Sequence, residues 1–196
     1  VCADLLENEE VLDLFQAWAK LTATRVRGAI LAQKALQLTV PGVADIYQGT
    51  ERLQTYLVDP DNRAPLKVKA LGAALEEIDS HSPHTLSQEK LSLTRAILHL
   101  RRRRPQDFVG PEADYTPLAT STAHLVAFAR GKDQDVVTVA SRLLRGLGGR
   151  DGLRDHTVVL PEGIWQDVHS SNLFEGGAQK AGDLLKHLPV VVLERV

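Results

Sequence analysis

The residues best suited to chemistry lie in one segment, from Pro41 to Arg63, where an apolar run leads into a polar loop. Val43–Tyr47 is apolar at most positions, which predicts a strand buried on both faces. The loop after it supplies four candidate ligand-binding residues: Asp59, Asp61, Asn62 and Arg63. Their polar groups could hydrogen-bond the hydroxyls of a sugar, and the guanidinium could hold a carboxylate through two parallel bonds. The same residue types also form ordinary turns, so a purely structural loop is the alternative.

Two other polar clusters are better explained by structure than by chemistry. The run Arg101–Arg104 could contact nucleic acid, but it lies at the end of a predicted helix, where positive charge is favoured, and no aromatic side chain follows until Phe108. His81 and His84 have no third metal ligand near them in the sequence. We therefore expect neither a nucleic-acid site nor a metal site.

The two tryptophans are candidates for flat surfaces on which a sugar ring could stack. Trp18 lies in a predicted helix close to Phe15, which favours a place in the core. Trp165 lies in a strand-like stretch, and its pattern is equally compatible with a core position and with a sugar platform.

Helical spacing of apolar residues flanks the candidate segment on both sides. It predicts helices over residues 5–19, 24–38, 66–78 and 85–103. Thr85 and Gln88 form a capping box at the start of the last helix, and Pro105 ends it. A buried strand among helices that opens into a polar loop is typical of the active face of a (β/α) barrel.

After Pro105 the pattern changes from helical to strand-like. Strands are predicted over residues 124–130, 135–140, 157–160, 163–168 and 189–193. Several short strands with turn residues between them favour a small antiparallel β-sandwich. We therefore predict an α+β chain in two parts, 1–105 and 106–196.

The composition is that of an ordinary globular protein, with 43% hydrophobic residues and a net charge of -2. This balance gives no attraction to nucleic acid or to an anionic membrane, and we expect neither as a partner. Cys2 is the one cysteine, so we expect a reducing, cytoplasmic environment. The chain has no methionine, from which we expect part of a longer polypeptide; removal of an initiator methionine is the alternative.

Two motifs connect the candidate segment to a known family. Residues 41–51 (PGVADIYQGTE) resemble the last barrel strand of the α-amylase superfamily. Residues 57–66 (LVDPDNRAPL) resemble the signature of maltooligosyl trehalose synthases, which typically reads LVDPDNRRPV. Residues 90–103, 108–118, 124–130 and 160–165 also resemble this family, so the resemblance covers nearly the whole chain. Residues 52–56 and Ala64 depart from its pattern.

The resemblance implies the last helices and strand of a (β/α)8 barrel, followed by the β-sandwich. It implies part of an isomerase, a (1→4)-α-D-glucan 1-α-D-glucosylmutase of trehalose biosynthesis, whose substrate is a maltooligosaccharide and which needs no cofactor. The catalytic carboxylates of the family lie before this segment, so no catalytic residue is expected here. The matching positions imply residues that line or support the sugar site: Tyr47, Gln48, Glu51, Asp59, Asp61, Asn62 and Arg63.

On this interpretation the chain alone is inactive, and the unpaired flanks of its barrel strand lead us to expect self-association. Two other functions are compatible with the sequence. One is a non-catalytic carbohydrate-binding or scaffold module. The other is a hydrolase of the same superfamily.

Overall fold

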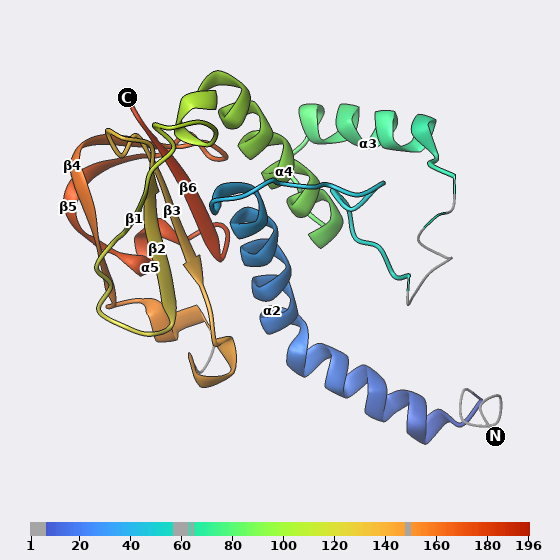
Figure 1. The fold of residues 1–196 in the computed structure, drawn as a ribbon. Coiled ribbons are helices and arrows are strands. Elements are labelled where there is room, and N and C mark those ends of the chain that lie inside the picture. The colour runs from blue at the N-terminus through green and yellow to red at the C-terminus, as the bar shows by residue number, and fades with distance from the viewer. Residues whose placement is uncertain (1–6, 57–62, 64, 148–149) are drawn as a thin grey trace.

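The fold combines helices with one antiparallel sheet (Figure 1). The computed structural model describes residues 7–56, 63, 65–147 and 150–196. Its helices are α2 (Glu9–Thr39), α3 (Val68–Ser80), α4 (Leu86–Arg103) and the one-turn α5 (Ala181–Leu184). Three 3-10 turns are η2 (Pro105–Asp107), η3 (Leu144–Leu147) and η4 (Arg150–Leu153). None of the helices in the described ranges is both long and apolar enough to cross a membrane.

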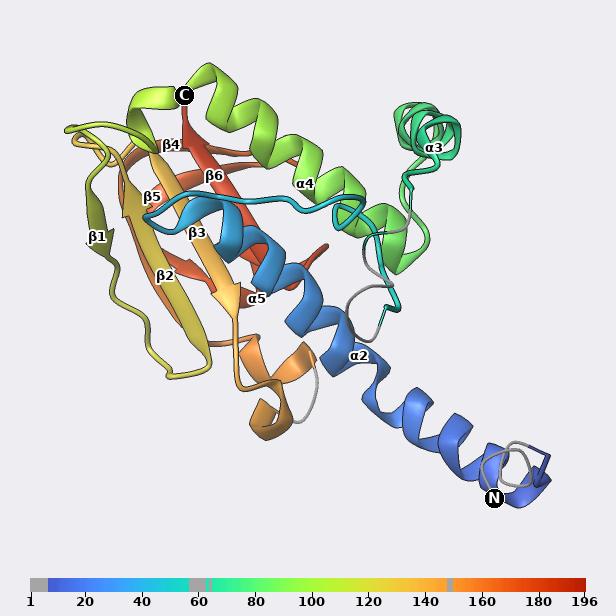
Figure 2. The ribbon, with the colours of Figure 1, turned by 45° about the vertical axis from the view of Figure 1, so that its right-hand side comes forward.

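Helix α2 is one continuous element of 31 residues, so the prediction of two helices with a break near residue 20 was wrong. The Asn8 side chain caps its start by accepting a hydrogen bond from the amide of Val11. Neither proline nor glycine interrupts the chain at the expected break, and the Thr22 hydroxyl donates to the Trp18 carbonyl within the helix, at 2.9 Å. The N-terminal half of α2 extends away from the rest of the molecule (Figures 1 and 2).

Helix α4 begins and ends as the sequence predicted. Both reciprocal bonds of the capping box between Thr85 and Gln88 are formed, and η2 begins at Pro105, directly after the C-cap. The helix lies beside α2, where Arg27 donates two hydrogen bonds of 2.7 Å to the Glu89 carboxylate. A half-buried, bidentate pair of this kind fixes the two helices relative to each other.

Six strands form the sheet in the order β1-β2-β3-β6-β4-β5, and every pair is antiparallel. They are β1 (Tyr115–Pro117), β2 (Leu125–Arg130), β3 (Val136–Ser141), β4 (Thr157–Asp167), β5 (Leu173–Lys180) and β6 (Val190–Arg195). Antiparallel pairing is therefore confirmed, whereas the two-sheet arrangement of a sandwich is not, because these strands share one hydrogen-bonded sheet. Strands β1 and β5 were not predicted.

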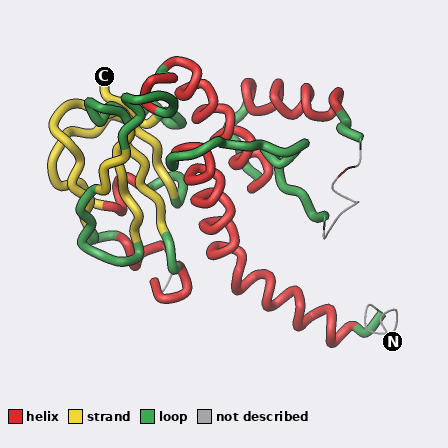
Figure 3. Tube along the Cα trace, in the orientation of Figure 1, coloured by secondary structure: helices red, strands yellow, loops and turns green. Residues whose placement is uncertain are grey.

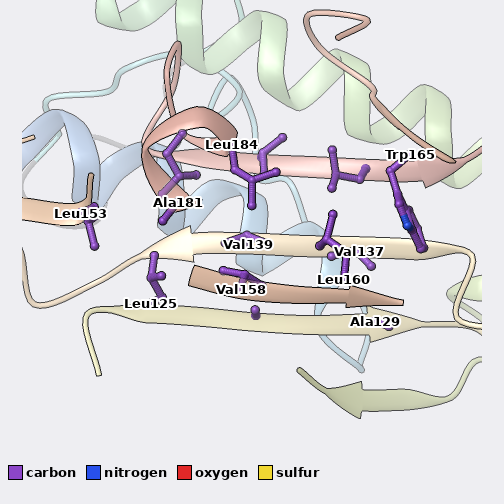
Figure 4. Close-up of a cluster of buried hydrophobic side chains, with 14 of the residues drawn as sticks. Leu125, Ala129, Val137, Val139, Leu153, Val158, Leu160, Trp165, Ala181 and Leu184 are labelled. Atoms are coloured by element: carbon purple, nitrogen blue, oxygen red, sulfur yellow. The ribbon is translucent and has the colours of Figure 1, made fainter. Parts of the chain in front are cut away.

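The predicted strands 157–160 and 163–168 are one strand, β4, with an irregularity inside it. Its pairing with β5 shifts in register between Leu160 and Ile164. Gly163, in this interval, has a φ of +128°, a backbone conformation that side chains disfavour. On both sides of this irregularity β4 contributes to one hydrophobic cluster, in which Val158, Leu160 and Trp165 lie with side chains of β2 and β3 (Figure 4).

Strand β3 separates two hydrophobic layers and is buried at every position. Val137 and Val139 face the first layer, where they pack with Val158 and Leu160 of β4 (Figure 4). Val136 and its neighbours on the opposite face belong to a second layer, which α2 and α4 complete with Leu31, Leu38, Leu93, Ile97 and Leu100. Figure 3 shows these helices against the sheet. A strand covered on both faces carries mostly apolar residues without alternation, and β3 fits this pattern except at Thr138 and Ser141.

Candidate functional site

The predicted strand Val43–Tyr47 is not formed, and this part of the prediction was wrong. The segment has no regular secondary structure and pairs with no strand in the described chain, and the Val43 side chain is 100% exposed. Only Ala44 and Ile46 pack against the helix–sheet core. The apolar run indicated a strand because such residues suit one, but a strand also needs a hydrogen-bonding neighbour, and the described residues supply none here.

Residues 45–54 instead form a loop held on helices α2 and α4, which we call the 45–54 loop. Gln37 of α2 donates to the Asp45 carbonyl at 2.5 Å. On α4, the Ser87 hydroxyl accepts hydrogen bonds from Arg52 Nε at 3.3 Å and from the Leu53 amide at 3.4 Å. Both ends of the loop are therefore fixed by side chains of different helices.

The centre of the 45–54 loop is a tight turn. The Thr50 amide donates to the Tyr47 carbonyl at 2.8 Å, and the Gln54 side chain donates to the Gly49 carbonyl at 2.8 Å. Gly49 is buried at a φ of +81°, which glycine adopts without strain. The turn leaves Tyr47 and Gln48 exposed and Glu51 half-buried, so three of the predicted site residues lie together on one structure.

Two lysines lie beneath this loop, and the sequence analysis did not single them out. Lys34 of α2 is 5% exposed and donates to Gln37 Oε1 at 2.6 Å, while Lys90 of α4 donates to the Arg52 carbonyl at 3.0 Å. Burial lowers the pKa of Lys34, and the charge of Lys90 lowers it further. Burial also lowers the pKa of Lys90, against the opposing effect of Glu51.

A sequence signal for Lys34 existed. It lies on the apolar face of its helix, three residues after Leu31 and four before Leu38, where a hydrophobic side chain is expected. A lysine on such a face needs a polar partner, and Gln37 of the same helix supplies it and in turn donates to the 45–54 loop. No comparable signal marked Lys90, because the pattern of its helix allows a polar residue there.

The remaining predicted site residues are placed only in part. Asp59, Asp61 and Asn62 lie outside the described residues. Arg63 is exposed. The proximity of the LVDPDNR motif to the 45–54 loop therefore stays a prediction.

The other candidate groups of the sequence have clear structural environments. Trp165 is 0% exposed, so it is a core residue and not a sugar platform, whereas Trp18 is 63% exposed and its predicted core position was wrong. Arg103 and Arg104 pair with Glu194 of β6, as expected for a helix end fixed by ion pairs. Within the described ranges, no three His, Cys, Asp or Glu side chains converge as metal ligands would.

A cleft of about 990 Å³ lies away from the 45–54 loop, between α2 and the segments around η4 and α5. Apolar side chains such as Leu144 and Leu185 line it together with charged ones such as Arg25 and Arg154. Its lining includes no aromatic residue and none of the predicted site residues. The cleft is therefore separate from the segment to which the motifs point.

Two curated proteins that are similar to this chain share the same name. Both, from the CDC 1551 and H37Rv strains of Mycobacterium tuberculosis, are named as maltooligosyl trehalose synthases, and each is 39% identical over 170 residues, or 84% of this chain. The chain spans only 20% of the length of these relatives. No protein-family model matches the chain.

Solved structures lead to the same family. A point mutant of maltooligosyltrehalose synthase from Arthrobacter ramosus matches 97% of this chain with a TM-score of 0.86 and 31% identity, and this chain covers 25% of it. A second structure of the Arthrobacter ramosus enzyme has a TM-score of 0.83 and 32% identity over 95% of this chain. The resemblance found in the motifs is thereby confirmed, and the chain belongs to the maltooligosyl trehalose synthase family.

Proposed function

We propose that this chain is part of an enzyme that converts the reducing-end α-1,4 linkage of a maltooligosaccharide into an α,α-1,1 linkage. The observation that carries the proposal is the 39% identity with curated maltooligosyl trehalose synthases over most of the chain. The reaction is an intramolecular transglucosylation, and it serves trehalose biosynthesis. The chain covers a fifth of those relatives, so the activity is proposed for a longer protein that contains it.

In this proposal the chain supplies binding groups and not catalytic ones. Retaining glycosidases use two carboxyl groups about 5–5.5 Å apart, one as nucleophile and one as acid/base. Neither motif of this chain matches those carboxylates. Sugar contacts come from the loop residues Tyr47, Gln48 and Glu51, which are exposed or half-buried, and from residues of the motif after it: Asp59, Asp61, Asn62 and Arg63.

The proposal also assigns a place to each part of the chain. Residues 1–105 would complete a (β/α)8 barrel, in which 43–47 gains the neighbouring strands that it lacks here, and residues 106–196 would form the β domain. A cytoplasmic location belongs to the proposal as well, because Cys2 is the one cysteine of the sequence. Barrel closure is tested in a longer polypeptide that includes this segment. Residues 43–47 are expected to pair there with neighbouring strands.

The purified chain is expected to leave maltopentaose unchanged, because both proposed catalytic carboxylates are outside it. Reducing ends are measured before and after incubation, with the chain alone and with a full-length protein that contains it. The full-length protein is expected to lower the reducing-end signal without releasing glucose. A rise in reducing ends would instead identify a hydrolase, and binding without any change would identify a non-catalytic module. Conversion by the chain alone would overturn the proposal.

We also propose that the isolated chain self-associates through the N-terminal half of α2. Four apolar side chains there are 63–71% exposed: Leu14, Phe15, Trp18 and Leu21. Acidic Glu9, Glu10 and Asp13 lie at one end of this stripe, and basic Lys20 and Arg25 lie at the other. An antiparallel pair of two copies would place the acidic end of each stripe against the basic end of the other.

Sedimentation of the chain over a range of concentrations is expected to reveal a monomer–dimer equilibrium. Trp18→Lys should weaken it at least about tenfold, because a charge then replaces an apolar contact at the centre of the stripe. Val109→Lys is the matched control, since Val109 is 67% exposed but lies far from α2 in the sequence, beyond α4. A monomeric mass at every concentration would contradict the proposal.

A further inference from the structure

Side chains of α2 and α4 hold much of the 45–54 loop in place. Its described contacts with these helices are the Gln37 bond to the Asp45 carbonyl, the two bonds to Ser87, and the Lys90 bond to the Arg52 carbonyl. Lys90 reaches the loop directly, whereas Lys34 reaches it through Gln37. Two lysines on different helices therefore contribute to the position of the 45–54 loop.

These lysines are unfavourable for the stability of the fold. Burial lowers the pKa of both, and although the charge of Glu51 opposes this, neither lysine forms an ion pair with a carboxylate in the part of the chain that the structure describes. Lys34 moreover occupies a core-facing position of α2, where a leucine or methionine would pack without this penalty. Charged groups that are kept at a cost in stability are characteristic of functional sites.

We propose that Lys90 and, through Gln37, Lys34 are positioning residues that fix the 45–54 loop on α4 and α2 and thereby orient Tyr47, Gln48 and Glu51. The contacts that carry this inference are independent of the proposed function. Its consequence for sugar binding rests on that function, because it requires these three side chains to face the substrate.

A purely space-filling role is the alternative, since long lysine side chains pack their methylene groups in apolar surroundings. Methionine separates the two roles, because it keeps the length of the side chain and removes the ammonium. If Lys90 only fills space, Lys90→Met leaves the loop unchanged. If Lys90 positions the loop, the variant loosens the loop while global stability stays the same or rises, because a desolvated charge is removed.

Amide hydrogen exchange of the purified chain measures both effects. In Lys90→Met, the amides of residues 45–54 are expected to exchange about tenfold faster, which corresponds to the loss of one hydrogen bond from a charged donor. Neither the exchange protection of the β3 amides nor the midpoint of thermal unfolding should fall. Lys69→Met is the matched control, because Lys69 is an exposed residue of α3. It should change neither the loop exchange nor the thermal midpoint.

Lys90→Arg provides the rescue, because it restores a charged donor and should return the exchange of the 45–54 loop to within about threefold of the original chain. If Lys90→Met does not fold, Lys90→Gln replaces it, since glutamine also removes the charge. Unchanged exchange in the 45–54 loop of a folded, uncharged variant would overturn the positioning role.

The activity of a full-length protein with the same substitution tests the proposed function separately. A loosened loop with a raised KM and a nearly unchanged kcat is expected if the loop orients binding groups. A loosened loop with unchanged KM and kcat would leave the positioning role intact and would contradict the assignment of Tyr47, Gln48 and Glu51 to the sugar site.

Discussion

Replacement of Trp165 with alanine is expected to lower the free energy of unfolding by about 3–5 kcal/mol, the usual cost of removing a large aromatic side chain from a core. The indole is 0% exposed and belongs to the first hydrophobic layer, with side chains of β2 and β3 (Figure 4). Its Nε1 donates to the Pro161 carbonyl at 2.9 Å, and the Arg195 guanidinium lies 5.0 Å from its ring centroid. The substitution therefore removes packing volume, a hydrogen bond and a cation–π contact together.

Chemical denaturation followed by circular dichroism measures this loss. Trp18→Ala is the matched control, because the same truncation at a side chain that is 63% exposed should change stability by less than about 1 kcal/mol. Domains are stable by about 5–15 kcal/mol, so Trp165→Ala could leave too little folded protein, and Trp165→Phe then provides a milder test at about 1–2 kcal/mol. Equal losses for the two alanine variants would show that Trp165 is not a core residue.

The opposite environments of these tryptophans show what sequence patterns can and cannot predict. Trp18 has helical spacing with Phe15, which favoured a core, but the N-terminal half of α2 extends beyond the sheet that buries its C-terminal half. Trp165 was compatible with both environments, and its packing against side chains of other strands decides in favour of burial. Exposure depends on which elements meet in space, and the periodicity of one element contains no information about that.

Features set by local chemistry were predicted well. Thr85 and Gln88 make a capping box because the bonding groups are three residues apart, and Pro105 ends α4 because a proline cannot donate the next helical bond. The strand Val43–Tyr47 was predicted wrongly for the opposite reason. Its apolar residues suit a strand, but only a partner from another part of the polypeptide could complete one.

The same distinction applies to the candidate site. Family motifs pointed to Tyr47, Gln48 and Glu51, and the structure places all three on one anchored loop. The groups that anchor this loop were not predicted, because Lys90 and Ser87 meet it across more than thirty residues of sequence. A motif marks the residues that a family retains, whereas the supporting contacts become visible only when the helices are placed.

Arg130 is expected to have the second-largest effect on stability, and Arg130→Met should cost about 3 kcal/mol. The side chain is 1% exposed, and it donates to the carbonyls of Asp107, Phe108 and Ala113 at 3.1–3.4 Å. Its loss leaves these carbonyls without their charged donor, at about 1–3 kcal/mol each, while removal of a buried charge returns part of that cost. Arg102→Met, at an exposed position of α4, is the control and should stay within about 0.5 kcal/mol.

The pH dependence of Arg130→Met tests a second role of this side chain, the effect of its charge on Asp107. Burial raises the pKa of Asp107, and the positive charges of Arg104 and Arg130 oppose that rise. Without Arg130 the pKa of Asp107 rises further, so the folded state holds its proton more tightly than the unfolded state does. Such a group stabilises the fold below its unfolded pKa and loses that contribution as the pH rises through its folded pKa. Denaturation at pH 4 and at pH 7 should therefore show a smaller deficit at pH 4, and a deficit that is the same at both would mean that the charge of Arg130 does not act on Asp107.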